Sequence, residues 1–160
     1  MTDSATPANT PAVKLLDMMA AFGADSKLVN EGRWVGFPND ESEHKFLIAR
    51  LNNRGQRAMA SRLMLENREV FKNSDKDKAH EAKAEDALRE LEAKVMGTQI
   101  LKGWTPNIAI GGKVLGEYTP EKAIDLLVKF EDFRTWIESA AQDSGEYMLK
   151  PEVEEELAKN

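Results

Sequence analysis

Residues 100–147 read ILKGWTPNIAIGGKVLGEYTPEKAIDLLVKFEDFRTWIESAAQDSGEY, and they hold the densest large apolar residues of the chain and its clearest turn. A short β-hairpin is predicted between Trp104 and Thr119, because Ile108 and Ile110 alternate with other residues and a glycine pair follows them. Gly111-Gly112 is the expected turn, with a positive φ at one or both glycines. The hairpin is the first of the elements around which the rest of the chain is organised.

Two helices are predicted after the hairpin. Thr119-Pro120 is a helix start, because a threonine hydroxyl accepts a free backbone N–H and proline at the first helical position loses no hydrogen bond. Gly145 is the expected stop at the far end. The residues expected on the apolar faces are Ala123, Ile124, Leu127 and Phe130 in the first helix, and Phe133, Trp136, Ile137, Ala140 and Ala141 in the second.

The order of these elements resembles the tail assembly chaperones of long-tailed (siphovirus-type) bacteriophages. Upstream, FLIAR at residues 46–50 precedes an arginine-rich segment, as in members of that family, and the resemblance covers roughly residues 30–150. The residues that carry it are Gly103-Trp104, Gly111-Gly112-Lys113, Tyr118-Thr119-Pro120-Glu121, Leu126-Leu127 and Phe133–Tyr147.

The resemblance implies a non-enzymatic protein that binds the phage tape measure protein, keeps it soluble and recruits tail tube subunits. Such a protein acts in the host cell cytoplasm and is absent from the mature virion. Two alternatives stay open: a structural head-tail connector or tail completion protein of the virion, and a regulatory nucleic-acid-binding protein. Self-association into a homo-oligomer is also left open.

Composition limits the classes of protein. A length of 160 residues suits one ordinary domain with a modest core. The 31% of charged residues and the net charge of −6 favour a soluble helical protein and make nucleic acid the least favoured partner. The sequence contains no cysteine, and no apolar run approaches the roughly 18 residues of a membrane span.

Before residue 100, the chain is expected to begin with a disordered segment at 1–12 and a short helix at 13–22. Two short strands are predicted around Trp34–Phe37 and Phe46–Leu51. The single globular domain is expected to cover 13–147, and 148–160 to form an acidic flexible tail.

Helical periodicity begins near Asn53 and is interrupted at Asn73-Ser74-Asp75, where a second helix of roughly 25 residues is expected to begin. The two helices are expected to pair as an antiparallel hairpin. The predicted fold class is therefore mainly α with a small β element (α+β): a helical hairpin, a short β-hairpin and two C-terminal helices.

Arginines dominate the first of these helices. Three interpretations apply, in decreasing order of preference: ion pairs with Glu81, Glu85, Glu90 or Glu92 of the next helix, contact with a protein partner, and contact with nucleic acid. The tryptophans have two interpretations, as core residues or as anchors for a partner. The candidate partner-binding residues are Trp34, Arg54, Arg57, Arg68, Trp104 and Tyr118.

No catalytic or cofactor-binding pattern emerges. His44 and His80 have no nearby histidine as a second ligand, so no metal site is expected. The glycine pair lacks the spacing of a phosphate-binding loop, and no serine has the flanking glycines of a nucleophile elbow. The sequence therefore predicts no enzyme, no cofactor and no metal.

Overall fold

The computed structural model describes residues 14–39 and 43–150. Contacts divide the chain into two units, one formed by Met1–Gly23 with Leu149–Asn160 and the other by Ala24–Met148. The expected disordered segment at 1–12 and most of the expected acidic tail lie outside the described residues. That residues 13–147 fold as one domain stays a prediction.

The first unit contains α1 (Met18–Phe22), which begins at Asp17. The Asp17 carboxylate accepts a hydrogen bond from the Met19 N–H at 2.9 Å, and Gly23 ends the helix. The predicted helix at 13–22 is thus too long, since residues 14–17 are not helical and the cap decides where the helix begins. None of the α1 residues is buried.

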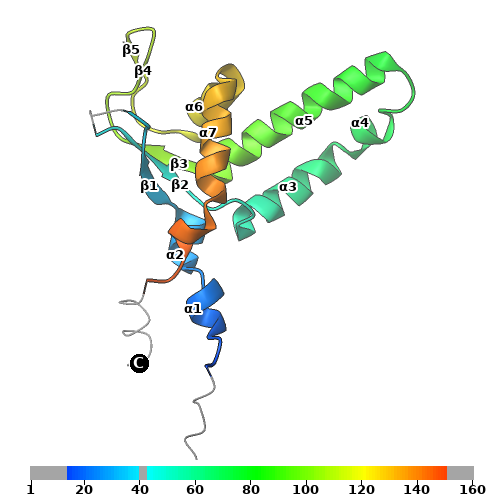
Figure 1. The fold of residues 1–160 in the computed structure, drawn as a ribbon. Coiled ribbons are helices and arrows are strands. Elements are labelled where there is room, and N and C mark those ends of the chain that lie inside the picture. Colours follow the sequence, from blue (N-terminus) through cyan, green and yellow to red (C-terminus); the bar gives the residue numbers. More distant parts are fainter. Residues whose placement is uncertain (1–13, 40–42, 151–160) are drawn as a thin grey trace, which may run out of the picture. The chain divides into compact units, whose positions relative to one another are not determined.

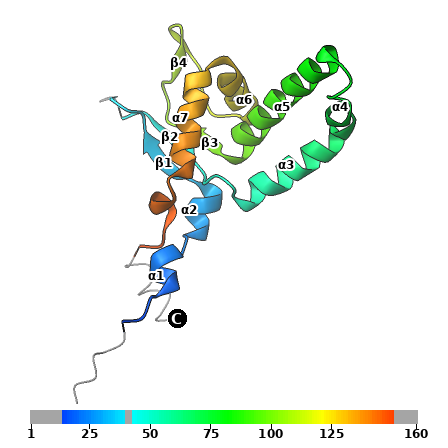
Figure 2. The same ribbon diagram turned by 45° about the vertical axis from the view of Figure 1, so that its right-hand side comes forward.

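Within the described residues, the second unit is built from twelve further elements, and Figures 1 and 2 show them from two sides. The predicted class, mainly α with a small β element, is confirmed. The helices are α2 (Ser26–Glu31), α3 (Arg54–Glu66), α4 (Arg68–Lys72), α5 (Lys78–Gln99), α6 (Pro120–Lys129), α7 (Glu131–Gln142) and the 3₁₀ helix η1 (Ser144–Tyr147). The strands are β1 (Arg33–Gly36), β2 (Lys45–Ile48), β3 (Leu101–Trp104), β4 (Ala109–Ile110) and β5 (Lys113–Val114).

A three-stranded antiparallel sheet has the order β1-β2-β3. Val35 pairs with Phe46, and Phe46 pairs with Trp104, so these side chains share one face. That face packs on the main core cluster, which includes Ile48, Leu101, Leu127 and Ile137. The next row, Trp34–Leu47–Gly103, lies on the opposite face of the sheet.

The helices α3 and α5 lie side by side as an arm, which confirms the predicted helical hairpin (Figure 1). A second cluster of Leu63, Leu91 and Val95 holds the arm together, separate from the main core cluster. At the base of the arm, Asn53 caps α3 and its amide donates to the carbonyl oxygen of Gln99 at 3.0 Å. The second helix begins later than expected, because Asp77 and not a residue of 73–75 supplies the cap.

The helix α6 crosses α5 at a very short distance. A Cβ added to Gly97 would lie 2.7 Å from Ile124 Cγ1 and 2.9 Å from the Ile124 nitrogen, so only glycine fits there. The predicted start of α6 is confirmed, with the Thr119 hydroxyl accepting the Lys122 N–H at 3.2 Å and Pro120 in the first turn. Local chemistry therefore places the helix start, and a glycine in another helix sets how closely it packs.

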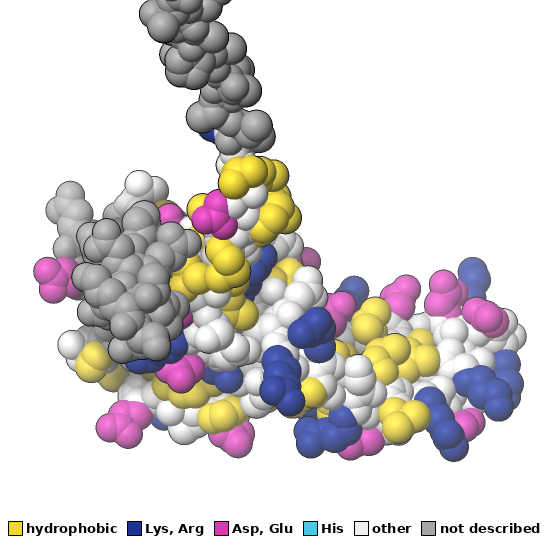
Figure 3. Space-filling model, turned by 90° about the horizontal axis from the view of Figure 1, so that it is seen from below, with side chains coloured by type: hydrophobic (Ala, Val, Ile, Leu, Met, Phe, Trp, Pro, Cys, Tyr) yellow, Lys and Arg dark blue, Asp and Glu magenta, His cyan; other side chains and the backbone are white. Residues whose placement is uncertain are grey.

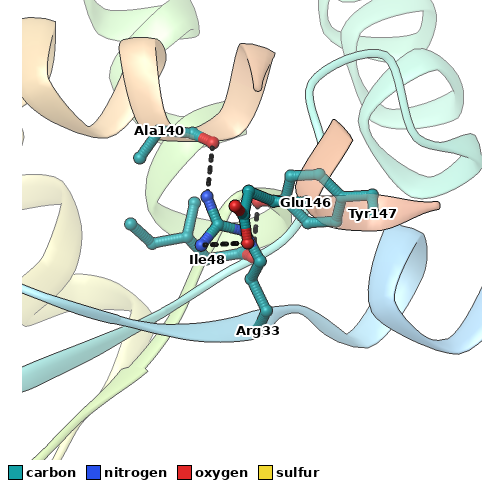
Figure 4. A network of polar contacts seen from close by, with 5 residues as sticks. All are labelled: Arg33, Ile48, Ala140, Glu146 and Tyr147. Atoms are coloured by element: carbon teal, nitrogen blue, oxygen red, sulfur yellow. Dashed lines mark hydrogen bonds and ion pairs between the residues drawn. The ribbon is translucent and has the colours of Figure 1, made fainter. Parts of the chain in front are cut away.

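Arg33 connects the sheet to the C-terminal helices (Figure 4). Its Nη2 donates to the carbonyl oxygen of Ala140 at 3.3 Å, and its guanidinium carbon lies 5.0 Å from the centre of the Tyr147 ring. The Tyr147 hydroxyl donates to the Ile48 carbonyl at 2.9 Å, while Glu146 approaches Arg33 Nη1 only to 3.9 Å. These contacts hold α7 and η1 against the sheet, and α7 supplies one wall of the site described next.

Candidate functional site: an apolar groove

An open groove lies where the end of β1, the β4–β5 hairpin, α6 and α7 meet. It has a volume of about 400 Å³, and nine of its ten lining residues are apolar. The lining residues are Phe37, Phe46, Ile108, Ala109, Ile110, Leu126, Phe130, Asp132, Phe133 and Trp136. We refer to this feature as the groove.

Aromatic side chains form the floor and one wall of the groove. The Trp136 ring lies 5.2 Å from the Phe37 ring and 5.6 Å from the Phe46 ring, both edge to face, and it stacks 6.0 Å from the Phe133 ring. Phe46 also contacts Phe133 at 5.2 Å. Such contacts fix the rings in place, so the groove is largely formed before anything binds.

Two of the lining rings are accessible from outside. Phe37 is 46% exposed and Phe130 is 38% exposed, whereas Phe46 and Leu126 are buried. Phe130 sits at the junction of α6 and α7, and Asp132 in the first turn of α7 is the only charged lining residue. The groove therefore offers apolar surface to an incoming apolar side chain, with a carboxylate at its rim.

The candidate residues of the sequence analysis lie elsewhere. Trp34 is 52% exposed on the open face of the sheet. Trp104 is 7% exposed and its indole N–H donates to the Gly116 carbonyl at 2.9 Å, which fits the core interpretation and not the alternative of a partner contact. Tyr118 is half-buried, and its hydroxyl contacts the carbonyl oxygens of Gly97 and Leu101.

The arm carries a separate charged surface, and Figure 3 shows lysine and arginine side chains in dark blue beside hydrophobic ones. Arg54, Arg57 and Arg68 are all exposed. In the described part of the chain, no ion pair joins the α3 arginines to α5, so the preferred intramolecular pairing is not found; Arg62 and Arg68 instead approach Glu66 and Glu69 near by in sequence. The reason is that Leu63 and Leu91 meet between the two helices, which turns their charged sides away from each other.

Sequence reasoning missed the groove as a site. It assigned Phe133 and Trp136 to a core stripe and Phe46 to a strand, and both assignments hold, since these residues pack in or on the main core cluster. It did not predict that these residues meet Phe37, Ile108 and Ile110 around an unfilled space. The available signal was the close spacing of three aromatic lining residues, Phe130, Phe133 and Trp136, along the sequence.

Metal binding and membrane crossing find no support in the described residues. No group of three or more His, Asp and Glu side chains is placed there to hold a metal ion. None of the helices described combines the length and apolar composition needed to cross a bilayer.

Comparison with protein families decides the origin of the chain. The model of the family described as YdaY prophage protein matches residues 53–160, which run from the cap of α3 through the arm, the β4–β5 hairpin and α7. The chain belongs to the YdaY prophage protein family. It is thus phage-derived. No curated protein and no solved structure matches it.

Proposed function

We propose that this prophage protein is a tail assembly chaperone whose groove binds an amphipathic helix of the tape measure protein. The observation that carries the proposal is the open, aromatic-lined groove with exposed Phe37 and Phe130. The resemblance of roughly residues 30–150 to tail assembly chaperones supplies the partner. Membership of a prophage family is consistent with it.

The groove suits the apolar side of one helix. Grooves that receive helices bind side chains spaced three or four residues apart, and a volume of about 400 Å³ holds a few such side chains. Asp132 at the rim would lie beside a basic residue of the bound helix, and that exposed pair would add little affinity. Binding would therefore depend on the buried apolar contacts and would survive moderate salt.

The chaperone role follows from the chemistry of a tape measure protein. A long amphipathic chain exposes apolar stripes that aggregate unless they are covered. A bound protein with a net charge of −6 covers part of a stripe and also makes the complexes repel one another. No step requires a catalytic residue or a cofactor. Recruitment of tail tube subunits, action in the host cytoplasm and absence from the virion belong to the same proposal.

Co-expression with the tape measure protein of the same prophage tests the proposal. We expect the tape measure protein to move from the insoluble to the soluble fraction and to co-purify with this chain. Phe37→Glu should abolish both effects, because it places a charge at the mouth of the groove. The matched control is Val128→Glu, on α6 but outside the groove and 64% exposed, which should leave both effects intact.

The outcomes separate the alternatives. Equal loss with both variants, or no loss with either, would exclude the groove as the binding site. Purified phage particles that contain the chain in stoichiometric amounts, with no effect on tape measure solubility, would favour a structural head-tail connector or tail completion protein instead.

A further inference from the structure

The strand β1 forms one edge of the three-stranded sheet. Its two outward-facing backbone positions can be identified from hydrogen bonding. The Phe37 N–H donates to the His44 carbonyl at 3.3 Å, so these residues are a hydrogen-bonded pair. Such pairs alternate along an antiparallel ladder, which makes Val35–Phe46 hydrogen-bonded as well. The N–H and C=O groups of Trp34 and Gly36 therefore point away from β2.

An independent contact supports this assignment. The Thr105 N–H donates to the Lys45 carbonyl at 2.9 Å, so Lys45 turns its carbonyl towards the β3 side and not towards Gly36, its partner in β1. In the described part of the chain, no backbone hydrogen bond outside the ladder involves Trp34 or Gly36. Both residues are exposed. The edge thus presents two donors and two acceptors to solvent.

We propose that this edge pairs with the same edge of a second copy of the chain, antiparallel and centred on Val35. A two-fold axis between the two copies of Val35 places Trp34 of each chain opposite Gly36 of the other chain. Both positions have their backbone groups turned outward, as the hydrogen-bonded pairs of an antiparallel ladder require. The register is therefore self-complementary, and it joins two three-stranded sheets into one of six strands.

The side chains on the Trp34 face of the sheet leave room for this strand pairing. The Trp34 ring reaches across its own sheet, since its Cη2 lies 3.8 Å from the position of a Cβ on Gly103. Gly36 has no side chain, and a Cβ added there would meet no atom within 4 Å. The described residues therefore place no atom against Gly36, and β1 carries no carboxylate that would repel its copy.

At its two outward-facing positions, the edge of β1 carries none of the usual features that prevent strand pairing. Edge strands commonly carry an inward-pointing charge, a lysine or a proline that prevents pairing. The two outward-facing positions of β1 carry none of these. The proposal does not depend on the chaperone function, because no residue of β1 lines the groove. Phe37 does line it, but Phe37 follows the strand.

Sedimentation equilibrium of the full chain tests the association. We expect a dimer, and a monomer for Gly36→Pro, because proline removes an outward N–H while leaving every bond of its own sheet in place. Gly36→Ala keeps the N–H and should remain dimeric. Far-UV circular dichroism establishes that the proline variant is folded.

Cysteine cross-linking tests the register, and it does not require the proline variant. The chain has no cysteine, so Val35→Cys introduces one thiol per copy. The two thiols face each other across the axis in a non-hydrogen-bonded pair, where Cα atoms lie about 4.5 Å apart and a disulfide can form. Gly36→Cys is the matched control, since its thiol is more exposed but lies two positions from its symmetry mate.

We expect mild oxidation to produce a covalent dimer of Val35→Cys and little or none of Gly36→Cys. Equal or faster cross-linking of Gly36→Cys would overturn the register. A chain that stays monomeric at high concentration would overturn the proposal.

Discussion

At the scale of single residues, Tyr118 joins the segment before α6 to α5 and β3. Its hydroxyl lies 2.8 Å from the Gly97 carbonyl oxygen and 2.7 Å from that of Leu101, and its ring lies edge to face on Trp104 at 5.0 Å. A hydroxyl has one hydrogen and therefore donates to one carbonyl at a time. Burial, with a smaller contribution from Glu121, raises the pKa of Tyr118 to about 12. The sequence suggested this residue as a partner contact, but its hydroxyl is occupied within the chain.

Replacement of Tyr118 by phenylalanine should alter stability in a pH-dependent way. Because the pKa of Tyr118 is raised, the folded state keeps the Tyr118 proton above pH 10, where the unfolded chain loses it. The stabilisation from this difference is complete below pH 10 and is lost as pH rises towards 12. Tyr118→Phe should cost about 1–2 kcal/mol at neutral pH by leaving a buried carbonyl unpaired. Urea unfolding of Tyr118→Phe over this pH range should show a shallower decline in the free energy of unfolding than urea unfolding of the wild type does.

Some decline should remain in that variant, because burial also raises the pKa of Tyr147. Parallel pH profiles for the two proteins would show that the Tyr118 hydroxyl makes no such contribution.

At the scale of elements, the β4–β5 hairpin depends on its turn. Ala109 pairs with Val114 and Ile110 with Lys113, and Gly111 and Gly112 between them have φ of +56° and +81°. The predicted turn is confirmed. Since Ile108 and Ile110 line the groove from this hairpin, the turn also affects the site.

Gly112→Val should destabilise the protein by about 1–2 kcal/mol, because a β-branched residue is strained at this φ. Added side-chain atoms would meet nothing within 4 Å at the Cβ, so the cost comes from the backbone alone. Thermal unfolding measures it. Gly111→Asn is the control, since asparagine tolerates the left-handed region and should change stability little. Equal destabilisation by both variants would contradict the backbone explanation.

At the scale of the whole second unit, two apolar clusters hold different regions. Leu63, Leu91 and Val95 stabilise the arm, and the main core cluster joins the sheet to α6 and α7. The far end of the arm, around α4, has no buried residue. Regions with few buried apolar contacts open at lower free energy than the core.

Leu91→Ala should therefore open the arm without opening the rest of the unit. The substitution should cost about 2–5 kcal/mol locally, as for other buried leucines. Hydrogen exchange should accelerate in α3, α4 and the first half of α5, while α6 and β2 keep their protection. Leu127→Ala, a matched change in the main core cluster, should accelerate exchange throughout; a uniform response to both changes would show one cooperative unit.

Several elements could be predicted from sequence because their causes are local. Thr119 and Pro120 determine where α6 begins, and a glycine pair permits the turn after β4. The start of α5 was misplaced, because Asn73-Ser74-Asp75 and Asp77 are all plausible caps and the chain uses the last. Ion pairs between α3 and α5 were wrongly expected, since the rotation of each helix is set by apolar packing across the arm.

The sequence by itself determined the class of fold, the hairpin turn, the start of α6 and the prophage family, since turn residues, apolar periodicity and family patterns all lie within short distances along the chain. Only the tertiary structure decided that Trp104 is a core residue, that Phe37 meets Trp136, and that a space remains between them. Those outcomes depend on how closely helices and strands distant in sequence approach. That approach is set by side-chain volumes such as the missing one at Gly97, which no local pattern records.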